Sequence, residues 1–368
     1  MLHYCLYYVN LLLVKGDVKM KNFKKMIAIL LAISLIAVFP AGASALSIND
    51  GIEPIKEQFV FGEGPAVGDY SIDYRYFSPV KEKDKTKYPL VIWLHGMGDG
   101  AEDGTQVKKS NIAYWASDEF QARFEPAGGA FILAARSREE DNMFWDNSLI
   151  EPLRAAIDDF IAKNKANIDL TRIYVGGYSM GGKMTYKMAT AYPELFAAAF
   201  PICPAWAPSD EMLEKIKDMP IWLTSSRRDP LVNYYLGVSP TWDRLVEIST
   251  VPEKCRFSTL TKVCYEDGKA TSSSHHAWFA VNHDMFSAEN GDYPYMTTVN
   301  GLGENVKLEF PNGMISWLSS QTSDYDGAKG NGSGNASIDD STSLIYVDSF
   351  FGFFELIYNA ILKVLRIK

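Results

Sequence analysis

A serine between glycines is the residue of this chain best suited to covalent chemistry. Residues 177–181 read Gly-Tyr-Ser-Met-Gly, with Ser179 at the centre, after the apolar run 173–175 and before the helix-compatible stretch 183–189. This order predicts a strand, a tight turn and a helix that present the serine hydroxyl in a strained, exposed conformation. The pattern favours a nucleophile; a glycine-rich turn that happens to hold a serine is the alternative.

A second glycine-rich turn supplies donors for a developing negative charge. Residues 88–94 predict a buried strand, which runs into the turn 95–100. A turn at the end of a strand can aim a backbone N–H at the nucleophile, as can the start of the following helix. We expect the N–H groups of Met97 and Met180 to form the oxyanion hole. His95 precedes the nucleophile and is expected to brace this loop by hydrogen bonding.

An acid and a base follow the serine in the order that a serine hydrolase needs. Residues 219–226 predict a strand, and Asp229 comes just after it, where a carboxylate orients the catalytic histidine. An ordinary turn residue before proline is the alternative for Asp229. Of the five histidines in the chain, three lie further on, and the base is expected among them: His275, His276 and His283.

Strands and helices alternate around these candidates. Residues 130–135 predict a buried strand, 149–163 have helical spacing, and 69–77 alternate polar and apolar residues as an edge strand does. Such alternation predicts a mostly parallel sheet with helices on both faces. Ligands bind at the carboxyl ends of such strands, where the candidates lie.

These segments resemble the serine esterases of the α/β-hydrolase superfamily. The likeness is greatest to the secreted bacterial group of predicted peptidases, feruloyl-esterase-like proteins and polyhydroxybutyrate-depolymerase-like esterases. It implies an α/β-hydrolase fold in a single catalytic domain, with a mostly parallel central sheet flanked by helices. Its specific parts are Leu-His-Gly-Met-Gly at 94–98, Gly-Tyr-Ser-Met-Gly-Gly at 177–182 and Tyr-Pro-Glu-Leu-Phe-Ala-Ala-Ala at 192–199.

The resemblance also ranks the histidines. In that family the catalytic histidine stands three positions before a tryptophan, which places the base at His275, before Trp278. His276 is the first alternative and His283 the second. The family's usual glycine before the histidine is Ser274 here.

The mechanism implied is acyl transfer. Ser179 attacks an acyl carbon after passing its proton to His275, which Asp229 holds in the correct tautomer. The N–H groups of Met97 and Met180 hold the oxyanion, and water hydrolyses the acyl-enzyme. This scheme calls for no metal and no organic cofactor.

Three tryptophans lie in loops near the expected site: Trp145, Trp206 and Trp278. They are candidates to line a pocket for an acyl or aromatic group of the substrate. Packing in the core or in the loops is the alternative for each, because tryptophan is well buried wherever it occurs.

The cysteines leave one pairing open. Cys203 lies in an apolar segment and is expected to be a buried free thiol. Cys255 and Cys264 can form a disulfide if the stretch between them folds back. A continuous strand, at about 3.3 Å per residue, would keep them apart.

The amino terminus predicts export. A basic segment, an apolar run and small residues follow one another over residues 20–45, which is typical of a signal peptide cleaved after Ala45. A membrane anchor is the alternative, although the apolar run is shorter than the ~20 residues needed to span. Translation is expected to start at Met20, because the codons of residues 15–17 can form a ribosome-binding sequence. Residues 1–19 would then be a leader that does not belong to the protein.

Composition divides the rest of the chain. Residues 46–320 are expected to form the catalytic domain, and 321–343, rich in Asp, Gly, Asn and Ser, a flexible linker. Residues 344–368 predict an amphipathic helix. Its part 350–368, with a wide apolar face and terminal cations, suits a membrane interface or a groove on a partner protein. Docking on the catalytic domain is the alternative.

A formal net charge of −9 argues against nucleic acid as a partner, though not against neutral polysaccharide esters. The leading interpretation is a secreted or cell-surface carboxylic-ester hydrolase, acting on acyl or feruloyl esters of polysaccharides. A serine peptidase of the same fold and a non-catalytic surface-binding protein are the alternatives.

Overall fold

The structure is a computed structural model that describes residues 55–141, 143–265, 268–285, 295–306 and 313–327. The signal peptide expected at 20–45 and the helix expected at 344–368 lie outside the described residues, as does most of the expected linker.

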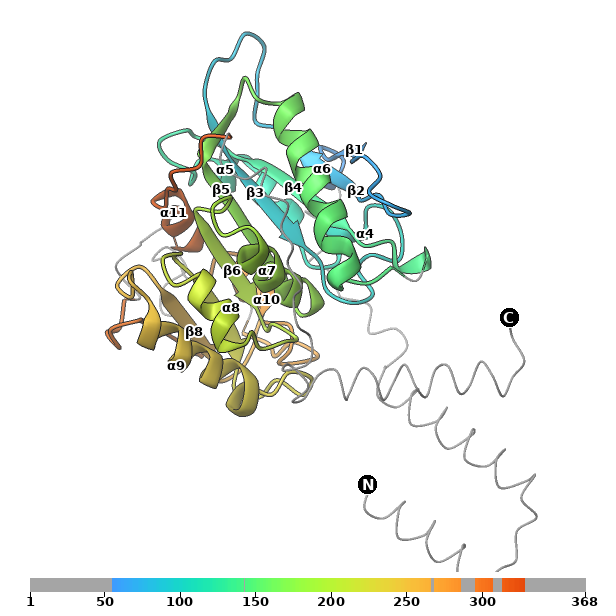
Figure 1. Ribbon diagram of the computed structural model, residues 1–368. Helices are drawn as coiled ribbons and strands as arrows, with labels where there is room; N and C mark the ends of the chain where they lie inside the picture. The colour runs from blue at the N-terminus through green and yellow to red at the C-terminus, as the bar shows by residue number, and fades with distance from the viewer. Residues whose placement is uncertain (1–54, 142, 266–267, 286–294, 307–312, 328–368) are drawn as a thin grey trace, which may run out of the picture. The chain divides into compact units, whose positions relative to one another are not determined.

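A sheet of nine strands forms the centre of the described part (Figure 1). The strands are β1 (Val60–Glu63), β2 (Asp73–Phe77), β3 (Tyr88–Leu94), β4 (Phe131–Arg136), β5 (Ile168–Tyr178), β6 (Ala198–Ile202), β7 (Trp222–Ser226), β8 (Arg256–Leu260) and β9 (Met296–Asn300). Their order across the sheet is β1-β2-β4-β3-β5-β6-β7-β8-β9. The six strands from β4 to β8 run parallel, and β1, β2 and β9 pair antiparallel at the two sides. This is the mostly parallel sheet expected.

Helices cover both faces of this sheet. One face carries α6 (Ile150–Lys163), α7 (Met180–Ala191), α8 (Asp210–Lys215) and α9 (Ser239–Ile248), which lie in front of the sheet in Figure 1. The other carries α4 (Thr105–Lys108), α5 (Asp118–Gln121), α10 (Trp278–Asn282) and α11 (Gly313–Ser319). Shorter turns are η2 (Ile112–Ala116), η3 (Glu139–Asp141), η4 (Asn147–Leu149) and η5 (Tyr234–Val238). In the described part of the chain, no helix has the length and apolar character needed to cross a membrane.

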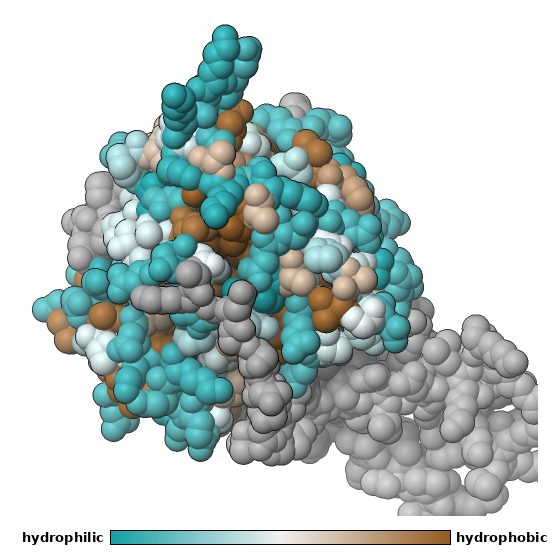
Figure 2. Space-filling model, turned by 45° about the horizontal axis from the view of Figure 1, so that its top comes forward, coloured by the Kyte–Doolittle hydropathy of each residue, from teal (hydrophilic) through white to brown (hydrophobic). Residues whose placement is uncertain are grey.

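The central strand β3 shows why the sheet is buried. Leu90, Ile92 and Leu94 pack into the core on one face, and Val91 and Trp93 pack into the core on the other. Successive side chains of a strand point to opposite faces, so an unbroken apolar run suits a strand that is covered on both. Over the face shown in Figure 2, hydrophilic side chains dominate and apolar ones are confined to small areas.

The strand predicted at 69–77 is not at the edge of the sheet. The observed strand β2 pairs on one side with β4 and on the other with β1, where Val60 lies opposite Tyr76. The edge is therefore β1, a four-residue strand with no fully buried residue. Because β1 has no buried face, its sequence carries no alternation that would have revealed it.

The domain expected at 46–320 extends further than predicted. Gln321 and Tyr325 are only 5% and 6% exposed. The Tyr174 hydroxyl donates to the Gln321 carbonyl at 3.1 Å, and the Ser323 N–H donates to the Thr171 carbonyl at 2.9 Å. Since these residues pack against β5, the predicted boundary at residue 320 is too early.

None of the cysteines in the described residues forms a disulfide. Cys203, Cys255 and Cys264 are all buried thiols, and Cys203 is without a disulfide as expected. Strand β8 runs between Cys255 and Cys264, so the extended alternative holds and the disulfide is absent.

Candidate active site

The turn between β5 and α7 holds Ser179 in a strained conformation. Its backbone has φ 59° and ψ −113°, which is unusual for a residue with a side chain. Hydrogen bonds to the neighbouring segment hold it there: Ser179 N–H donates to the Ile202 carbonyl at 2.9 Å, and Ala205 N–H donates to the Ser179 carbonyl at 3.0 Å. The residue is 4% exposed, less open than expected, because the turn and the His275 ring cover it.

The glycines of this turn are required by close packing. A Cβ on Gly181 would lie 1.9 Å from the Leu94 carbonyl oxygen and 2.6 Å from that of His95. A Cβ on Gly177 would lie 2.5 Å from the Leu94 oxygen. Because the nearest atoms belong to the backbone, they cannot move away as the end of a flexible side chain can. The turn therefore presses against the loop after β3.

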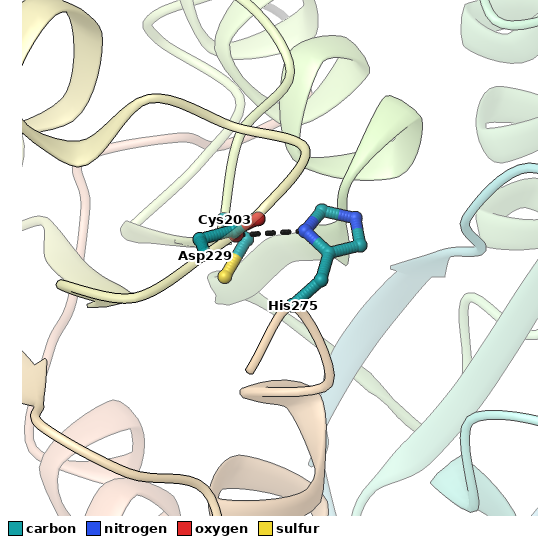
Figure 3. A group of neighbouring side chains, drawn as sticks. All are labelled: Cys203, Asp229 and His275. Atoms are coloured by element: carbon teal, nitrogen blue, oxygen red, sulfur yellow. Dashed lines mark hydrogen bonds and ion pairs between the residues drawn. The ribbon is translucent and has the colours of Figure 1, made fainter. Parts of the chain in front are cut away.

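The structure brings Ser179, His275 and Asp229 into one hydrogen-bonded chain. His275 Nε2 lies 2.9 Å from Ser179 Oγ, and His275 Nδ1 lies 2.7 Å from Asp229 Oδ2 (Figure 3 shows the second contact). The other carboxylate oxygen accepts the N–H groups of Leu231 and Val232, both at 2.9 Å. An acceptor-only carboxylate beside Nδ1 assigns the proton to that nitrogen, which leaves Nε2 to accept from the serine hydroxyl.

The two alternative bases, His276 and His283, do not lie between a carboxylate and the serine. His276 lies half-buried with its ring 6.0 Å from that of Trp278, and burial lowers its pKa to about 4. His283 accepts from the Asn111 side-chain amide at 3.1 Å and stacks on Phe279 at 4.0 Å. Of the three histidines, His275 is the one hydrogen-bonded to the serine.

His95 braces the loop after β3, as the sequence predicts. The Ser137 backbone N–H donates to His95 Nε2 at 3.1 Å, so Nδ1 carries the proton and donates to the Gly96 carbonyl at 2.7 Å. Burial lowers the His95 pKa to about 4 and keeps the ring neutral. Asp99 N–H also donates to the Gly96 carbonyl, at 3.2 Å.

These bonds set the direction of the Met97 N–H. In a trans peptide, the N–H points opposite to the carbonyl of the preceding residue. Because the Gly96 carbonyl points toward His95, the Met97 N–H points away from it. Met180 is the first residue of α7, where backbone N–H groups have no partner within the helix. The oxyanion role of Met97 and Met180 stays a prediction.

The three tryptophans lie in different surroundings. Trp145 is 1% exposed and donates its indole N–H to the His95 carbonyl at 3.1 Å. Trp206 is buried, with the Lys187 ammonium 5.3 Å from its ring centroid. Trp278 is half-buried, edge-on to Tyr178 at 6.4 Å. Trp145 and Trp206 therefore fit the packing alternative, and substrate contact by any of the three stays a prediction.

Sequence reasoning missed one neighbour of the acid. The Cys203 thiol lies beside Asp229 and His275, with one ligand-type atom from each residue within 4.8 Å of the others (Figure 3). Burial and the Asp229 carboxylate raise the pKa of Cys203 well above its usual range, so the thiol stays protonated. Since a metal ion needs a thiolate and would compete for the bonded Nδ1, the group fits a hydrogen-bonded chain better than a metal site. Its position could have been inferred from the strands: Cys203 directly follows β6, and β6 lies beside β7 in the sheet. Since Asp229 comes after β7, the two residues leave neighbouring strands at the same edge.

Comparisons with known proteins agree with this fold. The model of the prolyl oligopeptidase family matches residues 145–230. "Feruloyl esterase B" of Neurospora crassa is 27% identical over 139 residues, which cover 36% of this chain and 44% of that protein. The crystal structure of a thermostable esterase superposes with a TM-score of 0.55 at 27% identity, over 73% of this chain and 64% of that one. The chain thus spans less than two thirds of the length of either relative.

The sheet, the strained serine turn and these likenesses define the class. The chain has the α/β-hydrolase fold and is similar to esterases, and part of it also matches the prolyl oligopeptidase family.

Proposed function

We propose that this protein is a secreted serine hydrolase that cleaves carboxylic esters through an acyl-enzyme on Ser179. The observation that carries the proposal is the continuous chain from Asp229 through His275 to the Ser179 hydroxyl. Secretion rests on the signal peptide predicted at 20–45 and is part of the proposal.

Each member of the chain has a defined task. His275 Nε2 takes the proton of the Ser179 hydroxyl as its oxygen attacks the acyl carbon, and later gives a proton to the leaving alcohol. Asp229 accepts the hydrogen bond from Nδ1–H and stabilises the imidazolium that forms. The acyl-enzyme is then hydrolysed by water, which His275 activates as a general base.

The substrate class that we favour is an ester with an apolar or aromatic acyl group, such as a feruloyl ester of a polysaccharide. The feruloyl esterase relative supports this over the part of the chain that it matches. Three large apolar side chains from the loops after β3 and β7 are also exposed, which suits contact with such a group: Met97, Leu231 and Tyr235.

A serine peptidase remains the second candidate. The prolyl oligopeptidase model covers Ser179 and Asp229, and the same chain of groups can cleave amides. The choice between esterase and peptidase therefore depends on which substrates the protein accepts, because both activities use the same mechanism.

A hydrolysis panel tests the proposal. Purified mature protein is assayed with p-nitrophenyl esters, methyl ferulate, acetylated xylan and peptide anilides, and Ser179→Ala is the matched control. We expect wild-type activity on esters and none from the variant. Cleavage of anilides with no ester turnover would make the protein a peptidase, and inactivity on every substrate would favour a non-catalytic binding role.

A further inference from the structure

The loop that carries Met97 contains a backbone that can rotate. Gly98 has φ 84°, in the left-handed region, and glycine can leave that region at little cost. Rotation of the peptide between Met97 and Gly98 would exchange the places of the Met97 carbonyl and the Gly98 N–H and so alter the turn that presents the Met97 N–H. Such a loop needs contacts from outside to keep one arrangement.

Two charged side chains supply these contacts at Gly98. The Gly98 N–H donates to both carboxylate oxygens of Glu139, each at 2.8 Å. The Lys109 ammonium donates to the Gly98 carbonyl. The Gly98 N–H is thus bonded to an anion and the Gly98 carbonyl to a cation. Hydrogen bonds in which one partner is charged are stronger than those between neutral groups.

Both side chains are themselves anchored in the fold. Glu139 is half-buried and starts the turn η3, and its own N–H donates to the Gly100 carbonyl at 3.4 Å. Lys109 follows α4 directly, and the Thr105 hydroxyl at the start of α4 donates to the Asp99 carbonyl at 2.6 Å. The loop after β3 is therefore held between η3 and α4.

We infer that Glu139 and Lys109 are positioning residues of the oxyanion loop, which fix the two peptide groups of Gly98 so that the Met97 N–H stays aimed at the oxyanion. His95 fixes the peptide before Met97, and Glu139 fixes the one after it. Neither side chain needs to touch the substrate. The inference rests on the proposed function, since it concerns the same site.

The test compares three variants with wild type: Glu139→Ala, Glu139→Gln and Lys109→Met. The matched control is Asp141→Asn, which removes a charge from the same turn at an exposed residue that forms an ion pair with Arg138 at 3.5 Å. We measure kcat and KM with p-nitrophenyl acetate and the inhibition constant of phenylboronic acid. The boronic acid forms an anionic tetrahedral adduct with the serine that places one boronate oxygen in the oxyanion hole, so its affinity reports that hole directly.

Glu139→Ala should lower kcat by about 100-fold, the lower range for loss of one oxyanion donor, with KM almost unchanged. The boronic acid should lose affinity by the same factor as kcat/KM falls. Glu139→Gln, which keeps an acceptor oxygen for the Gly98 N–H, and Lys109→Met should lose less, and Asp141→Asn should match wild type. Active-site titration and thermal melting correct every value for the folded fraction.

The inference is overturned if Glu139→Gln and Lys109→Met turn over substrate and bind the boronic acid as wild type does. It is also overturned if Glu139→Ala loses activity only in proportion to its unfolded fraction. If wild type itself neither hydrolyses esters nor binds the boronic acid, the proposed function fails, and the inference fails with it.

Discussion

At the residue scale, two histidines with the same chemistry are set to different tasks by their partners. His275 lies between a carboxylate and a hydroxyl, so it can gain and lose a proton while a neighbour compensates the charge. His95 lies between a backbone N–H and a backbone carbonyl, which require a neutral ring with the proton on Nδ1. One histidine is suited to proton transfer, and the other is suited to fixing a peptide.

The low pKa of His95 predicts a pH dependence of stability. Its ordinary pKa is 6.5 and its pKa in the fold is about 4. Between these values the unfolded chain binds a proton that the folded protein does not. Acidification from pH 6.5 to 4 should therefore lower the free energy of unfolding, by up to about 3 kcal/mol for this group. Above pH 6.5 the contribution is fully present.

Urea unfolding at pH 7 and pH 5 measures this effect. His95→Asn should lose less stability on acidification than wild type does. His276, whose pKa burial also lowers to about 4, acts in the same window, so His276→Asn is measured beside it. An unchanged pH dependence in His95→Asn would contradict the assignment of a buried neutral ring.

The sequence was sufficient to predict Ser179, His275 and Asp229, but not the residues that position these three and the neighbouring loop. Ser179 stands out because a five-residue pattern joins a strand to a helix, and His275 because of its spacing from Trp278. Cys203 beside Asp229 and Glu139 beside Gly98 are contacts between loops that follow different strands. Such contacts depend on the order of strands in the sheet, which no local pattern in the sequence contains.

At the element scale, the predictions that match best are those of elements with a continuous buried face. The strand predicted at 88–94 matches β3 in full, because an unbroken apolar run fits a strand covered on both faces. The helix predicted at 149–163 is observed as α6, one residue shorter. Strand β1 and the turn η5 are among the elements that were not predicted; β1 lacks a buried residue and η5 has only two.

Because the serine turn packs against β3, a glycine-to-alanine substitution in that turn should destabilise the protein more than the same substitution elsewhere. Gly181→Ala places a methyl group 1.9 Å from the Leu94 carbonyl oxygen, so α7 and β3 must move apart. We expect a loss of stability of at least about 1–3 kcal/mol, the usual cost of overpacking, together with loss of hydrolysis. Thermal melting and an ester assay measure both.

Gly237→Ala is the matched control, because nothing lies within 4 Å of the added methyl group and its φ is not positive. It should melt within a few degrees of wild type, as surface substitutions usually do. Equal melting temperatures for Gly181→Ala and Gly237→Ala would show that the turn is not packed against β3.

At the scale of the whole molecule, the described part is one domain with the α/β-hydrolase fold that continues to at least Tyr325, and residues 328–368 lie beyond the described part. The sequence still predicts an amphipathic helix there, with large apolar side chains worth about 1.5–3 kcal/mol each when buried. Left exposed, such a face is unusual for a secreted monomer. Its terminal cations suit anionic headgroups.

Truncation after Gly327 tests this role of the carboxyl terminus. We expect the shortened protein to keep full esterase activity and to remain monomeric, whereas the full mature chain binds anionic liposomes or self-associates. Liposome flotation and size-exclusion chromatography measure the difference. The prediction is wrong if both proteins stay off liposomes and elute as monomers, or if truncation unfolds the domain.

Fluorophosphonate labelling with mass-spectrometric mapping tests whether Ser179, activated by His275, forms the covalent intermediate. We expect one labelled serine, Ser179, and no label on Ser179→Ala. His275→Ala should react slower by several orders of magnitude, whereas His276→Ala and His283→Ala should react nearly as fast as wild type. Label on another serine or wild-type labelling of Ser179→Ala would rule out Ser179 as the nucleophile, and an unreactive His276→Ala beside a reactive His275→Ala would rule out His275 as the base.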